Sequence, residues 1–476
     1  MRQLSGHDAS FLYADTIHAN SNVTFVQIYD QSTAPGGKLR FKTILAHIQS
    51  RLHRSPIFRS KLLRVPFELD EPYWVEDEHF DLEYHVRHIA LPKPGDWRQF
   101  CIQASRIHAR ALDLQRPLWE IYVIEGLDSI TDLPPGSFAL LTKIHHAAID
   151  IESRNEFIEV LHDATRRPPR PEPAEPWFPE RAPAPIALLA RAGVNAMLSP
   201  WRWVGPFARA VPAVMTFASD VLYPEHHQAA TRFNAVVSPH RVFDTRRFLR
   251  KEFQDIGRLV AGATVNDAVL AVCSGGLSRY LAAHAELPQA DLTAIVPLGI
   301  GAEYGPAGPS RRIFFGTNVA DPIERLAWIH RQTSAEPAPT QRDQALPACT
   351  ITHVPGPPAP VYLHGARMTY FSAILPIADG MGLVFAVTHY DGRIIVSPTS
   401  CRELMPDPQA FTQCVRDSFQ QYLALARGAP AARPRPARPR ASAVDRRSPS
   451  ARTARTGARR LRAARDGRRR SKAPRS

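Results

Sequence analysis

The sequence predicts a mixed α/β protein of two domains followed by a basic tail. Its 476 residues exceed what one ordinary hydrophobic core needs. Runs with the pattern of strands alternate with runs that have helical spacing, and a proline-rich stretch at 166–185 divides them. Proline disfavours helix interiors and central strands, so this stretch separates two folded regions. We expect a first domain at 1–165, a linker with an apolar amphipathic segment at 166–230, a second domain at 231–427, and a tail at 428–476.

The clearest strands of the first domain lie in its second half. Residues 117–125 and 137–144 are both β-rich, and the turn-prone segment 126–136 joins them. A helical run with apolar Phe157 and Ile158 follows. These runs predict two neighbouring strands and then a helix.

Helices are the clearest elements at the start of the second domain. Residues 255–281 have helical character, which is interrupted at Gly262. Thr264 is suited to cap the second helix, with Asp267 three residues later. We therefore expect two helices separated by a short break.

The positive charge of the chain lies in its tail. The whole chain carries a formal net charge of +14. Residues 428–476 hold 17 of the 59 basic residues but only 2 of the 45 acidic residues, so the rest of the chain is nearly neutral. The tail has almost no large apolar side chain to offset its ordering entropy, and we expect it to be disordered. It could bind anionic lipid or, nonspecifically, nucleic acid, or have no role, and no specific nucleic-acid partner is expected.

Hydropathy and cysteine usage indicate a cytoplasmic protein. No run of about 18 apolar residues is present, and the start lacks the apolar region of a signal peptide. The apolar segment 186–222 carries few charges, which suits either a helix lying on the inner membrane or a lipid droplet, or packing at the domain junction. The five scattered cysteines argue against a disulfide framework and a zinc ribbon.

The most informative polar cluster is at 143–150, where His145, His146 and Asp150 follow the second strand. Loops after strands commonly present catalytic groups. Adjacent residues of an extended segment point to opposite faces, so both histidines cannot face one metal ion, and no metal site is expected. One histidine can instead act as a general base toward an alcohol, while Asp150 braces the loop. A structural pair of buried histidines is the alternative that the pattern leaves open.

This cluster resembles the His-His-x-x-x-Asp-Gly motif of coenzyme A-dependent acyltransferases. Other stretches are similar to the bacterial wax ester synthase/diacylglycerol acyltransferase family, and together they span about residues 4–425. These stretches are LSGHDASFL at 4–12, PYWVED at 72–77, FDLEYHVRH at 80–88, RPLWE at 116–120, TVNDAVL at 264–270, VPGP at 354–357 and PIADGMGL at 376–383.

The resemblance implies a two-domain coenzyme A-dependent acyltransferase fold of the chloramphenicol acetyltransferase type. It implies transfer of a fatty acyl group from acyl-CoA, a co-substrate rather than a cofactor, to diacylglycerol, a long-chain alcohol or both. The two substrates would approach the base from opposite sides of a tunnel between the domains. His146, the second histidine of the motif, would be that base, with His145 and Asp150 beside it.

The resemblance also implies which residues bind substrate. They are Pro117, Leu118, Trp119, Asn266 and Asp267, and Asn266 is a candidate oxyanion donor. From the residues alone, Leu118 and Trp119 are equally suited to the core, and Asn266 and Asp267 to capping a helix.

Two features differ from the family pattern. Ile151 replaces the closing glycine of the histidine motif, and a β-branched residue does not easily take a positive φ. The region 301–349 is shorter than in the family. A member that binds acyl-CoA or lipid without efficient turnover is therefore an alternative function, and nucleic-acid binding through the tail is a further one.

Overall fold

The computed structural model describes residues 1–149, 156–167, 177–198, 231–297, 310–335 and 346–428. Contacts divide the chain into Met1–Arg433 and Pro434–Ser476, and all described residues belong to the first part. The expectations for the tail, and for Asp150 and Ile151, lie outside the described residues. The boundaries between the four predicted segments stay predictions.

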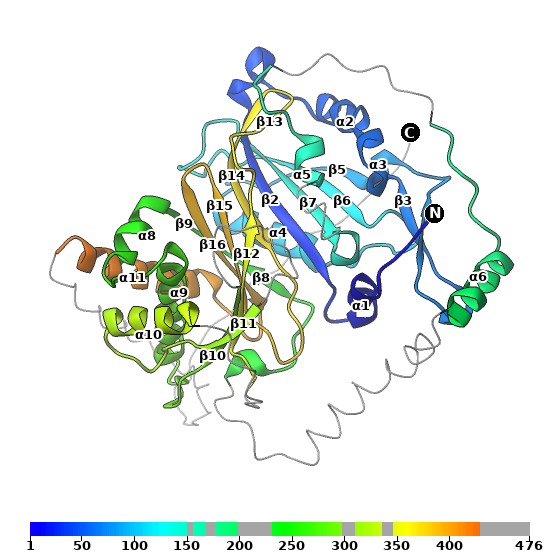
Figure 1. The fold of residues 1–476 in the computed structure, drawn as a ribbon. Helices are drawn as coiled ribbons and strands as arrows, with labels where there is room; N and C mark the ends of the chain where they lie inside the picture. The colour runs from blue at the N-terminus through cyan, green and yellow to red at the C-terminus, as the bar shows by residue number, and fades with distance from the viewer. Residues whose placement is uncertain (150–155, 168–176, 199–230, 298–309, 336–345, 429–476) are drawn as a thin grey trace, which may run out of the picture. The chain divides into compact units, whose positions relative to one another are not determined.

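A mixed sheet of six strands holds the predicted histidine site (Figure 1). Its order is β13, β14, β2, β7, β6, β5, and β2 lies antiparallel between β14 and β7. β6 is antiparallel to β7, and β5 is parallel to β6. The strands are β2 (Asn22–Asp30), β5 (Val86–Ala90), β6 (Trp119–Glu125), β7 (Phe138–His145), β13 (Tyr362–Leu363) and β14 (Ala366–Ile374). The two strands predicted near 117–144 are therefore confirmed as β6 and β7.

Both faces of this sheet are buried. Along β7, Phe138 and Leu140 belong to one hydrophobic cluster, while Ala139 and Leu141 belong to another, as the two-residue period of a strand requires. Helix α4 (Trp97–Ala109) covers the second face with its own apolar side chains. β7 is buried at every position, so the turn that follows it starts from a rigid base.

A second mixed sheet comes from the later part of the chain. Its order is β11, β10, β12, β15, β16, β8, and β9 also pairs with β16. The strands are β8 (Arg241–Phe243), β9 (Arg246–Leu249), β10 (Thr293–Pro297), β11 (Ser310–Phe314), β12 (Cys349–Pro355), β15 (Val384–Tyr390) and β16 (Arg393–Cys401).

Four helices gather beside this second sheet (Figure 1). They are α8 (Arg250–Gly257), α9 (Val265–Ala283), α10 (Pro322–Ser334) and α11 (Pro408–Ala426). α9 is buried along most of its length and packs against the other three, as expected for a helix that is apolar on all sides. A Cβ added at Gly276 would lie 2.9 Å from the Cα of Val415, so α9 and α11 approach each other closely. Two helices separated by a break that includes Gly262 are present as predicted, although α8 begins at Arg250 and ends at Gly257, earlier than expected, and Thr264 is the N-cap of α9.

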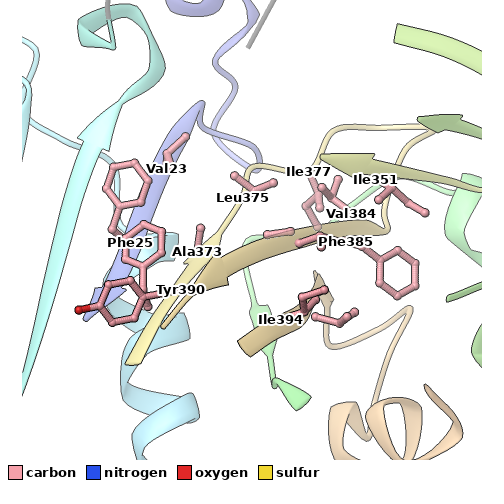
Figure 2. Packing of buried hydrophobic residues seen from close by; sticks show 14 of the residues in the cluster. Val23, Phe25, Ile351, Ala373, Leu375, Ile377, Val384, Phe385, Tyr390 and Ile394 are labelled. Carbon is pink, nitrogen blue, oxygen red and sulfur yellow. The ribbon is translucent and has the colours of Figure 1, made fainter. Parts of the chain in front are cut away.

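One hydrophobic core joins the two sheets. Val23 and Phe25 of β2 lie beside Ala373 of β14, and the same cluster continues to Phe385 of β15 and Ile394 of β16 (Figure 2). β14 is the link, because it is paired with β2 while it packs against β15 and β16. The two sheets are therefore held together by continuous apolar packing.

The remaining elements lie around the first sheet. A small sheet has the order β1, β4, β3. No helix in the described ranges combines the length and the apolar character needed to cross a bilayer. These remaining elements are β1 (Arg2–Gln3), β3 (Ser60–Leu63), β4 (Tyr73–Glu76), α1 (Gly6–Ala14), α2 (Phe41–Gln49), α3 (Leu82–His85), α5 (Glu156–Leu161) and α6 (Pro185–Leu198).

Candidate active site

The predicted histidine pair lies where β7 ends. His145 is the last residue of the strand, and His146 opens a short 3-10 turn, η6 (His146–Ala148). The main-chain N–H of His145 donates to the carbonyl of Leu118 at 3.0 Å, and that of His146 donates to the carbonyl of Ser21 at 2.8 Å. The main chain at the two histidines is therefore held from both sides.

His145 has both ring nitrogens engaged. Nδ1 lies 3.1 Å from the main-chain nitrogen of Ala147, and Nε2 lies 3.0 Å from Oδ2 of Asp15. A main-chain N–H can only donate, so Nδ1 must be the acceptor and the ring proton must be on Nε2, which donates to Asp15. The side chain is buried, at 1% exposure. With no free nitrogen, His145 is suited to hold the turn and not to exchange protons with a substrate.

His146 lies in a different environment from its neighbour. Its ring stacks on Phe11 with centroids 3.8 Å apart and planes 18° apart. Burial lowers the pKa of His146 to about 4, and the neighbouring His145 adds to this, while its own main chain and Asp8 oppose it. Among the described residues, Nδ1 of His146 has no hydrogen-bond partner. The imidazole is therefore neutral at pH 7 and has a nitrogen lone pair available for a proton.

A buried ion pair holds β7 to its neighbours near the histidine pair. Lys143 is fully buried, and its Nζ lies 2.9 Å from Oε2 of Glu120 on β6. The same ammonium donates to the carbonyls of Ile107 and Arg110, at the end of α4. Tyr122 also donates to Glu120, at 2.8 Å. These contacts tie β7, β6 and α4 together two residues before the histidine pair begins.

Pro117, Leu118 and Trp119 lie directly beside the histidine turn. β6 begins at Trp119, whose partner across the strands is Ile144, the residue before His145. All three residues are buried. Nε1 of Trp119 donates to the carbonyl of Phe58 at 3.0 Å, so its polar atom is already satisfied inside the core. Their proximity to the site is thus established, and substrate contact by them stays a prediction.

Asn266 and Asp267 lie in the first turn of α9 and are both buried. Asp267 accepts from the main chain and hydroxyl of Thr264, as in a capping box, and from Thr333 at 2.6 Å. His330 of α10 contacts it at 3.0 Å. Asp267 therefore joins α9 to α10. No hydrogen bond links either residue to the histidine pair in the described ranges, and their role with substrate stays a prediction.

Three cavities among the described residues are lined by residues other than His146. One of about 490 Å³ is lined by Ser55, Trp74 and Arg181, among others. Another cavity, of about 630 Å³, is lined in part by Tyr370 of β14. Tyr370 pairs with a residue of β2 that in turn pairs with Ala139 of β7. Seven residues of extended chain, about 20 Å, separate Ala139 from His146. The tunnel between the domains stays a prediction.

Comparison with known families identifies the family of this chain. The family model described as the wax ester synthase/diacylglycerol acyltransferase catalytic domain matches residues 4–269. The chain belongs to the wax ester synthase/diacylglycerol acyltransferase family. The model of the WS/DGAT C-terminal domain matches residues 345–422 as well. The family resemblance drawn from the sequence motifs is therefore confirmed.

Similarity to individual members of the family supports this membership. O-acyltransferase WSD of Acinetobacter baylyi is 30% identical, over 76% of this chain and 86% of that protein. A Mycobacterium tuberculosis protein named as a candidate diacylglycerol O-acyltransferase is 30% identical, over 86% of this chain and 87% of its own length. The solved wax ester synthase/diacylglycerol acyltransferase of Marinobacter aquaeolei VT8 superposes with a TM-score of 0.66 at 23% identity, covering 90% of this chain and all of that one. The predicted mixed α/β acyltransferase fold is confirmed.

The histidine site of this chain also includes residues that its sequence motifs did not indicate. Phe11, Asp15 and Ser21 all contact the histidine pair, and they come from α1 and the segment after it. The family stretch at 4–12 was a signal that could have drawn attention to α1. Nothing in the sequence indicates that α1 packs on a turn more than 130 residues later.

Proposed function

We propose that the chain transfers a fatty acyl group from acyl-CoA to the hydroxyl of diacylglycerol, of a long-chain alcohol, or of both, with His146 as the general base. The observation that carries this proposal is the contrast between the two histidines. His145 uses both ring nitrogens within the fold, while His146 is neutral and keeps a ring nitrogen for a proton. Membership of an acyltransferase family supports the reaction class.

In the proposed reaction, the acceptor hydroxyl gives its proton to the unprotonated ring nitrogen of His146 while its oxygen attacks the thioester carbonyl carbon. The carbon–sulfur bond then breaks, and the imidazolium returns the proton to the departing coenzyme A thiolate. The products are an ester and free coenzyme A, and His146 is neutral again. Because the pKa of His146 is low, its imidazolium is a strong acid, which favours this last proton transfer.

The test compares purified wild-type protein with His146→Ala, using labelled palmitoyl-CoA and either dioleoylglycerol or hexadecanol. We expect ester formation by the wild type and a loss of about 10²–10⁴-fold in kcat in the variant. His240→Ala is the matched control, because His240 is exposed and contacts Glu403 on the surface. A folded His146→Ala protein with wild-type turnover would exclude the general-base role.

The same assay distinguishes acyl transfer from the alternative function, which is binding of acyl-CoA without turnover. Ile151 stands where the family motif has glycine, and this favours weaker catalysis. A wild-type protein that binds palmitoyl-CoA but forms no ester with either acceptor would be a binding member of the family. Ester formation in only one of the two reactions would identify the acceptor class.

We further infer that α6 attaches the protein peripherally to a lipid surface. Leu188 and Ala192 bury one side of α6 against the protein, where Val65 and Tyr73 complete the cluster. Ile186, Val194 and Met197 lie on the side away from it, at 77%, 56% and 86% exposure. An exposed apolar stripe on a helix is suited to lie in the headgroup region of a bilayer or a lipid droplet.

A further inference from the structure

One carboxylate contacts both chain segments that hold His146. Asp15 follows α1 as its C-cap residue. Its Oδ2 accepts the Nε2–H of His145 at 3.0 Å, and its Oδ1 accepts the main-chain N–H of Ser21 at 2.7 Å. The Asp15 side chain is 21% exposed, so it is shielded from most solvent competition.

Each of these contacts continues to His146. Through Ser21, the path is a main-chain bond, because the Ser21 carbonyl accepts the N–H of His146 at 2.8 Å. Through His145, the path is the cap of η6, because Nδ1 of His145 accepts the N–H of Ala147 at 3.1 Å. The cap needs Nδ1 without a proton, and Asp15 stabilises that tautomer by accepting from Nε2.

We propose that Asp15 is a positioning residue for acyl transfer, which sets the place of the His146 ring through His145 and Ser21 without touching a substrate. The proposal rests on the proposed function of His146. It is independent of Asp150, to which the sequence analysis gave a bracing role and which lies outside the described residues.

The chemistry of Asp15 requires a carboxylate. Burial raises the pKa of Asp15, but the hydrogen bonds from His145 and Ser21 outweigh this and hold the pKa below its usual value. The group is therefore ionised at neutral pH, and both its oxygens are acceptors. An asparagine has one acceptor and one donor end, so it must lose either the Ser21 contact or the His145 contact. If it turns its NH₂ to His145, it favours the tautomer that cannot cap η6.

The kinetic test is Asp15→Asn, measured with palmitoyl-CoA and the better of the two acceptors. We expect kcat to fall about 10–100-fold, as for loss of a partner that orients a functional histidine, with KM changed less than about threefold. Asp30→Asn is the matched control. Asp30 also caps a short 3-10 turn by accepting the N–H of Ser32 at 2.9 Å, but it lies at the opposite end of β2 from the histidines. Its kcat should equal that of the wild type.

A second measurement follows the tautomer directly and needs no turnover. In protein labelled with ¹⁵N-histidine, the His145 signals, assigned by their loss in His145→Gln, should report a proton on Nε2 in the wild type. In Asp15→Asn they should shift toward the other tautomer or toward a mixture. A structural role alone would lower the melting temperature without this shift.

The outcomes separate the two proposals. If the wild type transfers no acyl group, the proposed function fails, and the tautomer shift still decides the effect of Asp15 on His145. An unchanged tautomer in Asp15→Asn, a wild-type kcat, or a fall in kcat that only matches a smaller folded fraction would each overturn the positioning role.

Discussion

The stacking of Phe11 on His146 determines how strongly this imidazole holds a proton. The Phe11 ring covers one face of the imidazole and contributes to the burial that lowers the pKa of His146 to about 4. We expect Phe11→Ala to admit water and to raise this pKa toward its ordinary value near 6.5. Only the neutral ring accepts a proton, so kcat/KM should fall below about pH 4–5 in the wild type and near pH 6 in the variant.

The measurement is kcat/KM from about pH 4 to 8 for the two proteins. Phe67→Ala is a suitable control, because Phe67 is 86% exposed on the surface. It should keep the wild-type profile. Coinciding acid limbs for Phe11→Ala and the wild type would show that Phe11 does not set the pKa of His146.

For single residues, the sequence predicts the histidines of the motif better than the residues that contact them. His145 and His146 lie at the end of a strand and differ in environment, as predicted, although His146 already belongs to a 3-10 turn. Asp15 and Phe11 are equally close to the site, yet neither was predicted. Their contacts depend on tertiary packing between segments about 130 residues apart, for which a local pattern carries no signal.

The exposed apolar stripe of helix α6 leads to a prediction about lipid binding. Ile186→Glu together with Met197→Glu places charges on its exposed apolar stripe without touching the buried Leu188. We expect the fraction of protein floating with phosphatidylcholine–phosphatidylglycerol vesicles to fall several-fold, because a charge does not partition into the headgroup boundary as an apolar side chain does. Ester formation with detergent-dispersed substrates should be unchanged.

Val236→Glu is the control for this experiment. Val236 is also apolar and 70% exposed, but it lies outside α6. Equal flotation of both charged proteins and the wild type would contradict a role of α6 in lipid attachment.

Elements defined by local signals were predicted well. The α8–α9 break and the Thr264 cap follow from residues within one helical turn, and both are confirmed. The pairing of β14 with β2 was not predicted. Strand pairing over hundreds of residues depends on which edges meet in the folded chain, and the hydrophobic pattern of one strand does not specify its neighbour.

For the whole molecule, buried neutral histidines predict loss of stability in mild acid. Burial lowers the pKa of His47, His162 and His353 to about 4 and that of His108 to about 3. In the unfolded chain, histidine binds a proton near pH 6.5. Between pH 6.5 and 4 the unfolded state therefore binds more protons, and the free energy of unfolding falls as the pH drops through this window.

Thermal unfolding from pH 7.5 to pH 5 measures this effect. The melting temperature should be nearly constant above pH 7 and should drop by several degrees by pH 5, at about 1 °C for each ~1 kcal/mol in a chain of this size. His162→Gln should weaken the pH dependence, and exposed His240→Gln should leave it unchanged. A constant melting temperature over the whole range would show that these rings titrate normally.

The place of β14 in the first sheet has a consequence for synthesis on the ribosome. Until β14 emerges, β2 is an edge strand with one row of main-chain groups unpaired, although its other neighbour, β7, is already made. The two strands of this pair are separated by about 340 residues, which at roughly 5–20 residues per second is a delay of about 17–70 s. During this time the nascent chain presents an apolar edge that can pair with other chains. Production of the protein should therefore depend on chaperones that bind early chain segments, and slower translation should increase its aggregation.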